Sequence, residues 1–394
     1  MKTHLLVSSV SIICLATATA CGQGTANTPP PHATTALSPA PSATSTSVDL
    51  PSFTDWRAAY LGMDRNLHVV TLDGKLDLAG PQLSDMTMNG LGLASAGMSP
   101  DGHLLAYVGA DGLKVVDVAG HASMNRAFTG GWANELFWSP DGSQLALSDG
   151  QSGIAVLRMS DGHTSIMPGD AGQELGELVG WTDNSHLLTT MLPLPQASRS
   201  GATTLALCGS SCPPSSTLPP LSLAVLDLAT GHIRTLGAFP QTGFGLLHFQ
   251  LSPDGTEALL FTDRFQADTF QPVVEVIDIA SGHVRLLANI TLLTHAGFFK
   301  VVWKPGTQTV AASGNAWLLD LAHDTATHFP TEQFVQGWSP DGGTLVIGTG
   351  YQTAFNKGPY ELNALTFSPS GRPIISPLTA SARTFPFLGF VRTG

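Results

Sequence analysis

A Ser-Pro-Asp-Gly tetrapeptide recurs along the chain and constrains its fold more than any other feature. Copies begin at Ser99, Ser139, Ser252 and Ser339. A large apolar residue precedes each copy and a short apolar strand follows it, as at 104–108. Pro and Gly set the backbone angles of a tight turn. Repetition at a spacing of about 40 residues or more indicates an array of similar units built one after another.

Two degenerate copies, at 182–185 and 304–306, extend the repeat to six turns. A second element follows most turns: a strand with a central Asp, as at 225–228, which usually leads into a Gly-His pair. Four short strands separated by Gly-rich turns, without helical periodicity, predict one β-propeller blade per repeat. The apolar residues directly before the six turns are Met98, Trp138, Trp181, Leu251, Trp303 and Trp338.

Six turns predict six blades, and unassigned strands remain at both ends of the repeat region. The segments 58–61, 67–70 and 76–78 look like the last three strands of a blade, whereas 387–391 looks like a first strand. Joining them completes a seventh blade, closes the ring and removes exposed sheet edges. We therefore predict an all-β fold, a single β-propeller over 51–394 with seven four-stranded blades, six or eight being the alternatives. The six internal blades are expected at 92–130, 131–170, 175–239, 244–291, 296–331 and 334–381.

The repeat resembles the TolB-type, WD-like propeller repeat. That family carries an aromatic-Ser-Pro-Asp-Gly turn and an apolar-Asp-apolar third strand, and the match covers about residues 55–394. The resemblance implies a propeller fold and, as one possible role, an interaction scaffold within an envelope complex. We expect this chain to lack the additional N-terminal α/β domain of the TolB family. The same repeat occurs in unrelated proteins, so it predicts the fold more sharply than the function.

The N-terminal fifty residues are predicted to lie outside the fold. Residues 1–20 have the features of a signal peptide, because the apolar run is too short to span a bilayer and ends in small residues. Small residues directly before Cys21 resemble a bacterial lipobox, so we expect Cys21 to be lipidated. Residues 21–50 are rich in Thr, Ser, Ala and Pro and predict a disordered tether. The expected location is the outer surface of the cell membrane or the envelope; cleavage by ordinary signal peptidase and secretion is the alternative.

Cysteine usage supports the lipid anchor. The chain has four cysteines, and Cys14 is lost with the signal peptide. If Cys208 and Cys212 form a local disulfide in an oxidising compartment, Cys21 is left for lipidation. A redox or metal site at this pair is the alternative. However, the spacing differs from that of redox motifs, and the segment offers no further metal ligands.

Charge and missing motifs exclude several function classes. The formal net charge is −12, with Lys+Arg 17 against Asp+Glu 29, and the cations are scattered. Nucleic acid binding needs clustered cations, so we expect no nucleic acid partner. The sequence contains no Gly-x-Ser-x-Gly motif, Gly-rich phosphate loop or dinucleotide fingerprint. The hydrolase domain that accompanies some propellers is therefore not expected.

Three connections between second and third strands are long, at 189–221, 262–273 and 348–361. Because they occupy equivalent positions in their blades, we expect all three to project from one face. Aromatic and basic residues within them suit contacts with a protein, a peptide or a glycan. Packing of the same rings on their own blades is the alternative. The candidate binding residues are Arg199, Asp263, Arg264, Phe265, Phe270, Tyr351, Phe355, Lys357 and Tyr360.

The recurring Asp and His residues are predicted to be structural. Asp in the first turn helps to form that turn, and the His residues follow turn glycines in separate blades. His248, His295 and Glu177 lie on or near the first strands, which line the central channel, and are candidates for a polar site in that channel. We predict a non-catalytic, surface-anchored monomer without cofactor or metal that binds a protein, peptide or glycan partner. The alternative is a metal-dependent, lactonase-like hydrolase acting on a small ester or sugar in the channel. The His residues after turn glycines are His121, His163, His232 and His283.

Overall fold

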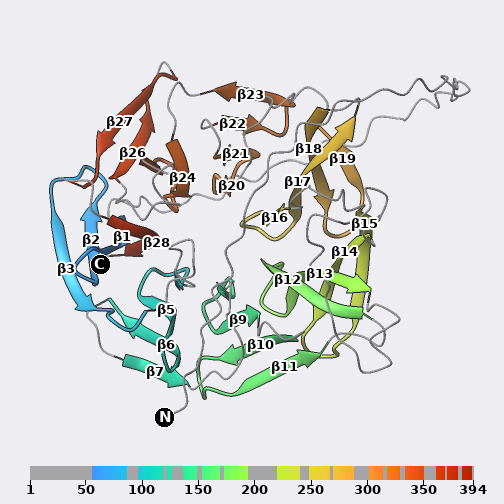
Figure 1. Ribbon diagram of the computed structural model, residues 1–394, viewed down its shortest axis with the longest axis horizontal. Helices are drawn as coiled ribbons and strands as arrows, with labels where there is room; N and C mark the ends of the chain where they lie inside the picture. Colours follow the sequence, from blue (N-terminus) through green and yellow to red (C-terminus); the bar gives the residue numbers. More distant parts are fainter. Residues whose placement is uncertain are drawn as a thin grey trace, which may run out of the picture. The chain divides into compact units, whose positions relative to one another are not determined.

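A computed structural model gives the architecture of the chain (Figure 1). The described residues are 56–86, 96–118, 122–126, 136–148, 153–168, 173–193, 220–239, 248–266, 269–287, 301–313, 317–328, 333–349, 361–368, 371–379 and 384–392. Within them the structure is all-β, without helices, so no helix of the described part could span a bilayer.

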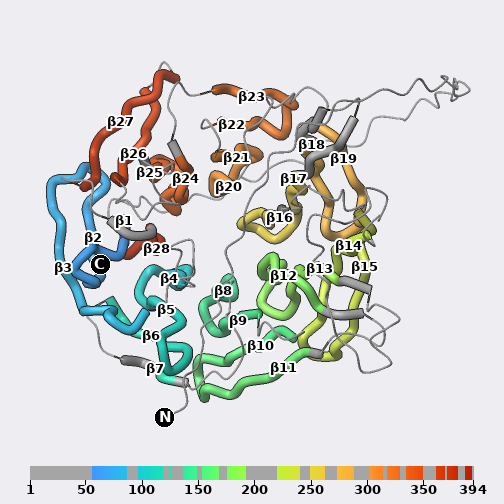
Figure 2. The backbone as a smooth tube through the Cα atoms, viewed as in Figure 1, coloured from blue at the N-terminus to red at the C-terminus, as the bar shows by residue number. Residues whose placement is uncertain are grey.

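Seven four-stranded antiparallel sheets form the blades of a β-propeller, which confirms the predicted fold class and blade number. The chain follows the blades round the ring in sequence order, with the inner strands toward the centre and the outer strands at the periphery (Figures 1 and 2).

We number the blades 1 to 6 along the chain and call the seventh the closing blade. Blade 1 comprises β4 (Ala96–Met98), β5 (Leu104–Gly109), β6 (Gly112–Asp117) and β7 (Ala122–Arg126). Blade 2 comprises β8 (Leu136–Trp138), β9 (Gln144–Ser148), β10 (Gly153–Arg158) and β11 (Thr164–Pro168). Blade 3 comprises β12 (Gln173–Trp181), β13 (His186–Pro193), β14 (Leu221–Asp227) and β15 (Ile233–Phe239). Blade 4 comprises β16 (His248–Leu251), β17 (Glu257–Gln266), β18 (Thr269–Asp278) and β19 (Val284–Leu286).

The remaining blades follow the same order. Blade 5 comprises β20 (Val301–Trp303), β21 (Thr309–Ala312), β22 (Trp317–Asp320) and β23 (Thr325–His328). Blade 6 comprises β24 (Gln333–Trp338), β25 (Leu345–Thr349), β26 (Glu361–Phe367) and β27 (Pro373–Pro377). The closing blade comprises β28 (Thr384–Arg392), β1 (Trp56–Gly62), β2 (Asn66–Thr71) and β3 (Asp77–Gln82). Its inner strand comes from the C-terminal end and its other strands from the N-terminal end, as predicted.

The Ser-Pro-Asp-Gly turns are held by a repeated set of hydrogen bonds. In blade 2 the buried Ser139 hydroxyl donates to Asp141 Oδ1 at 2.7 Å and accepts the Gln144 N–H at 2.9 Å. The Ser143 N–H donates to the same Asp141 oxygen at 3.0 Å. Gly142 has a φ of 70°, a left-handed conformation that favours glycine. The other three copies repeat the Ser–Asp hydrogen bond, so the recurring Asp is structural, as predicted.

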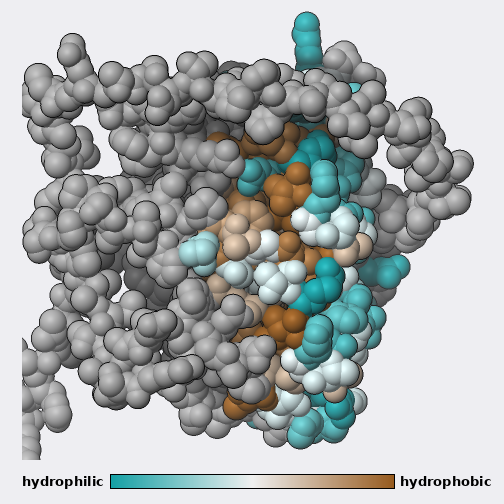
Figure 3. Space-filling model, turned by 90° about the vertical axis from the view of Figure 1, so that its right-hand side faces the viewer, coloured by the Kyte–Doolittle hydropathy of each residue, from teal (hydrophilic) through white to brown (hydrophobic). Residues whose placement is uncertain are grey.

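The core lies between blades rather than at one centre. One cluster, for example, joins Leu61 and Leu67 of the closing blade to Leu105 of blade 1, and all three are fully buried. Burial of a leucine side chain stabilises a fold by about 2 kcal/mol. On the side of the ring that carries β15 and β19, several hydrophobic patches lie one above another, with hydrophilic residues along one side of them (Figure 3).

The inner strands fall into two groups, with and without a register shift. The group matches the size of the apolar residue that stands before the first turn of the next blade. Four inner strands pair regularly with their second strands, and the next blade then carries Trp before its turn. In three of these cases the indole N–H donates to an inner-strand carbonyl of the preceding blade, at 2.9 to 3.3 Å. The other three inner strands contain a register shift, and the next blade carries a smaller residue at that position. A bulge adds a residue to the strand and bends it. In these three blades the bulged strand fills the space that the Trp indole occupies beside the regular inner strands. The smaller residues are Leu251, Phe390 and Met98.

Candidate functional site

Most of the predicted loop-face residues lie outside the described residues. This holds for Cys21, for the predicted disulfide partners and for five of the predicted binding residues, whose roles therefore stay predictions. These are Cys208, Cys212, Arg199, Tyr351, Phe355, Lys357 and Tyr360.

The predicted loop at 262–273 is wrong, because β17 and β18 continue through it as a hairpin. Their register runs to Gln266↔Thr269. We call residues 262–266 and 269–273 the arm. Aromatic and β-branched residues in this segment favour β-strand pairing. The charged residues between them made the strand pattern hard to recognise in the sequence.

The arm extends beyond its blade. Inner strand β16 pairs with β17 only as far as Phe261, and outer strand β19 pairs with β18 only as far as Glu275. Among the described residues, the two halves of the arm pair only with each other. The hairpin brings four predicted binding residues together in register, with Phe265 directly opposite Phe270, Arg264 opposite Gln271, and Asp263 opposite Pro272.

The arm and the Ser-Pro-Asp-Gly turns lie at opposite ends of the blade strands. Successive turns of an antiparallel meander alternate between the two ends of its strands. The Ser-Pro-Asp-Gly turns join first to second strands, whereas the arm joins a second to a third strand. The two faces of the propeller are thus distinct, and we call them the turn face and the arm face.

A polar cluster in the closing blade was missed by the sequence analysis. His68 lies between two carboxylates, with its Nδ1 3.1 Å from Asp77 Oδ1 and its Nε2 3.2 Å from Asp64. The Tyr60 hydroxyl donates to Asp77 Oδ2 at 2.5 Å, and burial together with that carboxylate raises the pKa of Tyr60. These groups come from β1, the turn after it, β2 and β3. No short sequence motif therefore indicates the cluster.

A second polar cluster lies where the closing blade meets blade 1. The Lys114 ammonium binds Asp85 and lies 3.1 Å from Asp111, and the Tyr107 hydroxyl donates to Asp85 at 3.2 Å. Burial and the Asp85 charge raise the pKa of Tyr107 to about 12. The ion pair links Asp85, in the connection after β3, to Lys114 on β6. The cluster therefore stabilises the interface between the closing blade and blade 1.

The predicted channel residues are not brought into a described cluster. Glu177 lies exposed on β12, His248 lies on β16, and His295 falls outside the described residues. Within the described ranges, no group of three or more His, Cys, Asp or Glu side chains could hold a metal ion. The turn histidines His163 and His283 are in different blades, and their side chains are partly or fully exposed.

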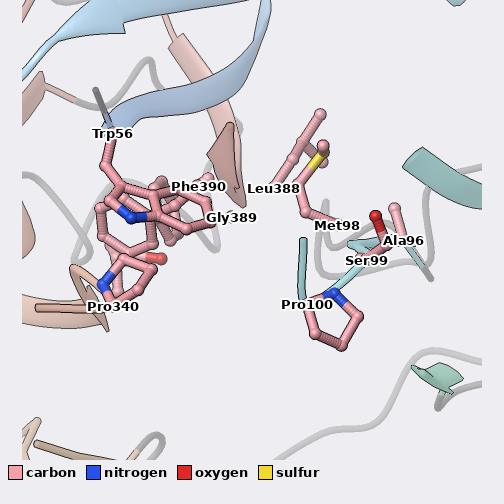
Figure 4. Close-up of a pocket in the computed structure, with 12 residues that line it drawn as sticks. Trp56, Ala96, Met98, Ser99, Pro100, Pro340, Leu388, Gly389 and Phe390 are labelled. Atoms are coloured by element: carbon pink, nitrogen blue, oxygen red, sulfur yellow. The ribbon is translucent and has the colours of Figure 1, made fainter. Parts of the chain in front are cut away.

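A pocket of about 400 Å³ lies at the inner strand of the closing blade (Figure 4). We call it the closing-blade pocket. Its base is formed by 388–390 of β28, and residues of β4 and β24 with their following turns form the two sides. Trp56 and Pro340 lie together on one side, and Met98 and Pro100 on the other (Figure 4).

The pocket arises because the closing blade has no first turn of its own. In blades 2, 4 and 6 the first turn packs on the turn of the preceding blade; a Cβ on Gly255, for example, would lie 1.9 Å from the Thr182 carbonyl oxygen. In the closing blade the chain ends replace this turn, and blade 1 packs on them: the Arg392 N–H donates to the Gly102 carbonyl at 3.3 Å. Two consecutive inner strands around the pocket, β24 and β28, also carry the register shift. The space beside Pro340 therefore has no neighbouring turn to fill it.

Comparison with known proteins supports the fold alone. No family model matches the chain, and no curated protein matches it. A chain in the crystal structure of the Mitotic Checkpoint Complex is similar with a TM-score of 0.50 and 15% identity, over 89% of this chain and 98% of that chain. Kuenenia stuttgartiensis hydrazine synthase is similar with a TM-score of 0.51 and 14% identity, over 83% of this chain and 99% of that chain.

These likenesses agree with the seven-bladed propeller of the structure. Such a fold supports a binding or an enzymatic role, and the site must decide between them. The resemblance to the TolB-type repeat and the lipid anchor stay predictions.

Proposed function

We propose that this protein is a non-catalytic binding propeller that recognises a protein, peptide or glycan partner through its arm face. It acts as a monomer, is exported, and is held by a lipid on Cys21 at the outer surface of the membrane or envelope. The 21–50 segment serves as a flexible tether between the anchor and the ring. The arm of blade 4 is the observation that carries the proposal.

The arm is not required to complete the ring. In blade 1 the corresponding connection closes at once, with Gly109 opposite Gly112. A two-stranded ribbon is at best marginally stable in water, so the five register pairs from Thr262↔Val273 to Gln266↔Thr269 cost conformational entropy without adding to a four-stranded blade. A partner strand or surface packed on the ribbon would offset that cost.

The residue types of the arm suit recognition. Aromatic and arginine residues dominate the energetics of protein interfaces. Phe265 and Phe270 are directly opposite in the register, and Arg264 is one position away. The arm thus concentrates in one hairpin the residue types that the sequence analysis selected for binding.

The test compares partner retention by three forms of the 51–394 propeller. In the first variant, an Asn-Gly turn replaces 262–273; this dipeptide suits a two-residue hairpin. In the control, the turn residues 323–324 of blade 5, of which His323 is exposed and Asp324 half-buried, are replaced by Asn-Gly. We expect a partner crosslinked by the wild-type propeller and identified by mass spectrometry to be lost from the arm variant and kept by the control. Retention of that partner by a folded arm variant would contradict the proposal.

A further inference from the structure

We propose that the arm binds an extended segment of a partner protein, which adds to one edge of the arm as a further β-strand. That edge, which we call the inner edge, is formed by 262–266 of β17 and continues the edge on which β16 pairs within the blade. The inference rests on the proposed function and narrows its partner from a protein, peptide or glycan to an extended peptide strand.

The backbone groups on the inner edge can be assigned from the hydrogen bonds of blade 4. Along a strand, the N–H and C=O groups of successive residues point alternately to its two edges. The Ser252 N–H donates to the Glu257 carbonyl at 2.8 Å, so Glu257 faces the edge on which β16 lies. The register of β17 with β18 advances one residue at a time over the whole of β17. Asp263 and Phe265 lie an even number of positions beyond Glu257, so their backbone groups point to the inner edge as well.

The inner edge presents hydrogen-bonding groups in the pattern that a peptide strand requires. Asp263 and Phe265 each supply one N–H and one C=O. In the described part of the chain no strand lies beside them, because β16 pairs only as far as Phe261. Such an edge is a template for another strand. A second peptide strand repeats its own groups at the same interval, roughly 6.8 Å for every second residue, whereas a glycan has no N–H and C=O ladder of this period. The chemistry of the edge therefore favours a peptide.

The outer edge of the arm, formed by 269–273 of β18, is unsuited to the same role. The Leu287 N–H donates to the Val274 carbonyl at 3.0 Å on the side of β19, so every second residue from Val274 faces the outer edge. Pro272 is one of these residues, and it has no N–H to donate. Proline on an exposed edge is a common means of preventing strand addition. Since 262–266 contains no proline, the inner edge is the one that can accept a strand in full register.

The two inner-edge residues also indicate the sequence of the partner strand. Phe265 lies opposite Phe270 in the arm, and cross-strand neighbours of an aromatic residue are most favourable when they are aromatic or β-branched. Asp263 lies two positions away, where a residue of opposite charge is favoured. The partner segment is therefore expected to carry an aromatic or β-branched residue and, two positions from it, Lys or Arg.

The first test examines the backbone of the bound peptide. Linear 12-residue peptides are selected from a phage-displayed random library on the 51–394 propeller, after removal of those that bind the variant in which Asn-Gly replaces 262–273. The tightest peptide is synthesised with each backbone nitrogen methylated in turn, and binding is measured by fluorescence polarisation. An added strand directs every second N–H toward the arm. We expect methylation to weaken binding by roughly tenfold or more at alternate positions, and by less than about threefold at the positions between them.

The second test changes the inner edge itself. Asp263→Pro removes an N–H from that edge, as Pro272 does on the outer edge, and should weaken binding of the same peptide by roughly tenfold. Asp263→Ala keeps the N–H and should weaken binding by less than about threefold. Phe270→Pro is the matched control for proline in the arm, because Phe270 faces the outer edge; it should also have an effect of less than about threefold. Melting temperatures establish that the three variants are folded.

Three results would overturn the inference. Methylation effects without alternation, or wild-type affinity in folded Asp263→Pro, would mean that the peptide is not held as an added strand. A wild-type propeller that elutes as a dimer, and that Asp263→Pro converts to a monomer, would mean that the edge binds a second copy of this chain. A library without any peptide that distinguishes the wild type from the arm-shortened variant would mean that the arm accepts no peptide strand.

Failure of this inference can be told apart from failure of the proposed function. A crosslinked partner that is lost when 262–273 is replaced, but kept by Asp263→Pro, would show that the arm recognises its partner without strand addition. The proposed function then stands and the strand inference fails. A partner kept by both variants would contradict the proposed function itself.

Discussion

Trp56, the first residue of β1, lies directly opposite Arg392, the last residue of β28. The two ends of the described propeller are therefore neighbours in one sheet, although they come from opposite ends of the sequence. Every contact of β28 with β1 joins distant parts of the chain. Closure of the ring consequently depends on the packing of this one inner strand.

Substitution of Leu388 tests the closure. Leu388 lies on β28 and is 5% exposed. Leu388→Ala should lower the free energy of unfolding by about 2–5 kcal/mol, since it removes buried methyl groups and leaves a cavity. Chemical denaturation followed by tryptophan fluorescence measures the loss.

The control for closure is Ile375→Ala on the outer strand β27, where the side chain is 40% exposed. It should change stability by no more than about 0.5 kcal/mol. Equal effects of the two substitutions would mean that β28 contributes no more to stability than an outer strand does.

Asp141 predicts a pH dependence of stability. Hydrogen bonds from the Ser143 N–H and from the Ser139 hydroxyl hold the pKa of Asp141 below its usual value. A carboxyl whose pKa is lower in the folded state stabilises the fold above its unfolded pKa of about 4. That contribution is lost as the pH falls through the lower, folded pKa.

Asp141→Asn should therefore lower the melting temperature at pH 7 and reduce the further decrease between pH 7 and pH 2. Thermal unfolding monitored by circular dichroism at several pH values measures both effects. Glu177→Gln serves as the control at an exposed carboxylate. A wild-type pH profile in Asp141→Asn would show that the hydrogen bonds of this turn do not favour the charged form.

Some features of the fold were predictable because they are local. In the Ser-Pro-Asp-Gly turn the hydrogen bonds that hold the Asp carboxylate and the Ser hydroxyl close within six residues, from Ser139 to Gln144, so the tetrapeptide alone indicates both the turn and the role of its Asp. The closing blade was predictable as well, because leftover strands at both ends can pair only with each other.

The pocket and the bulged strands could not be predicted in this way. Gly389 approaches Met98 although the two residues lie far apart in the sequence, and no local pattern encodes such a contact. The arm was mistaken for a loop because charged residues such as Asp263 and Arg264 hid its strand pattern. Of the predicted binding residues, the structure brings Asp263, Arg264, Phe265 and Phe270 together in register.

Cys21 predicts the location of the protein. If Cys21 carries a lipid, Cys21→Ser should move the protein from the membrane fraction into the soluble exported fraction. Fractionation and immunoblotting of cells that express each form measure this shift. Cys208→Ser is the control, because it leaves the lipidation position intact and should remain with membranes. A Cys21→Ser protein that fractionates with membranes as the wild type does would contradict the anchor.

The indole hydrogen bonds between blades predict unequal effects of Trp substitutions. The Trp181 Nε1–H donates to the Phe137 carbonyl at 2.9 Å. Trp338 is similarly buried, 6% exposed against 5%, but its Nε1–H has no hydrogen-bond partner among the described residues. Trp→Phe removes similar volume at both positions and removes a hydrogen bond only at Trp181.

Trp181→Phe should therefore destabilise the fold by about 1 kcal/mol more than Trp338→Phe, the typical net value of one hydrogen bond. Urea unfolding of both variants at pH 7 gives the difference. The Trp338 variant is the matched control, because both residues precede a first turn and pack against the inner strand of the preceding blade. If Trp338→Phe proves the more destabilising change, packing of the ring at the blade seam outweighs the indole hydrogen bond.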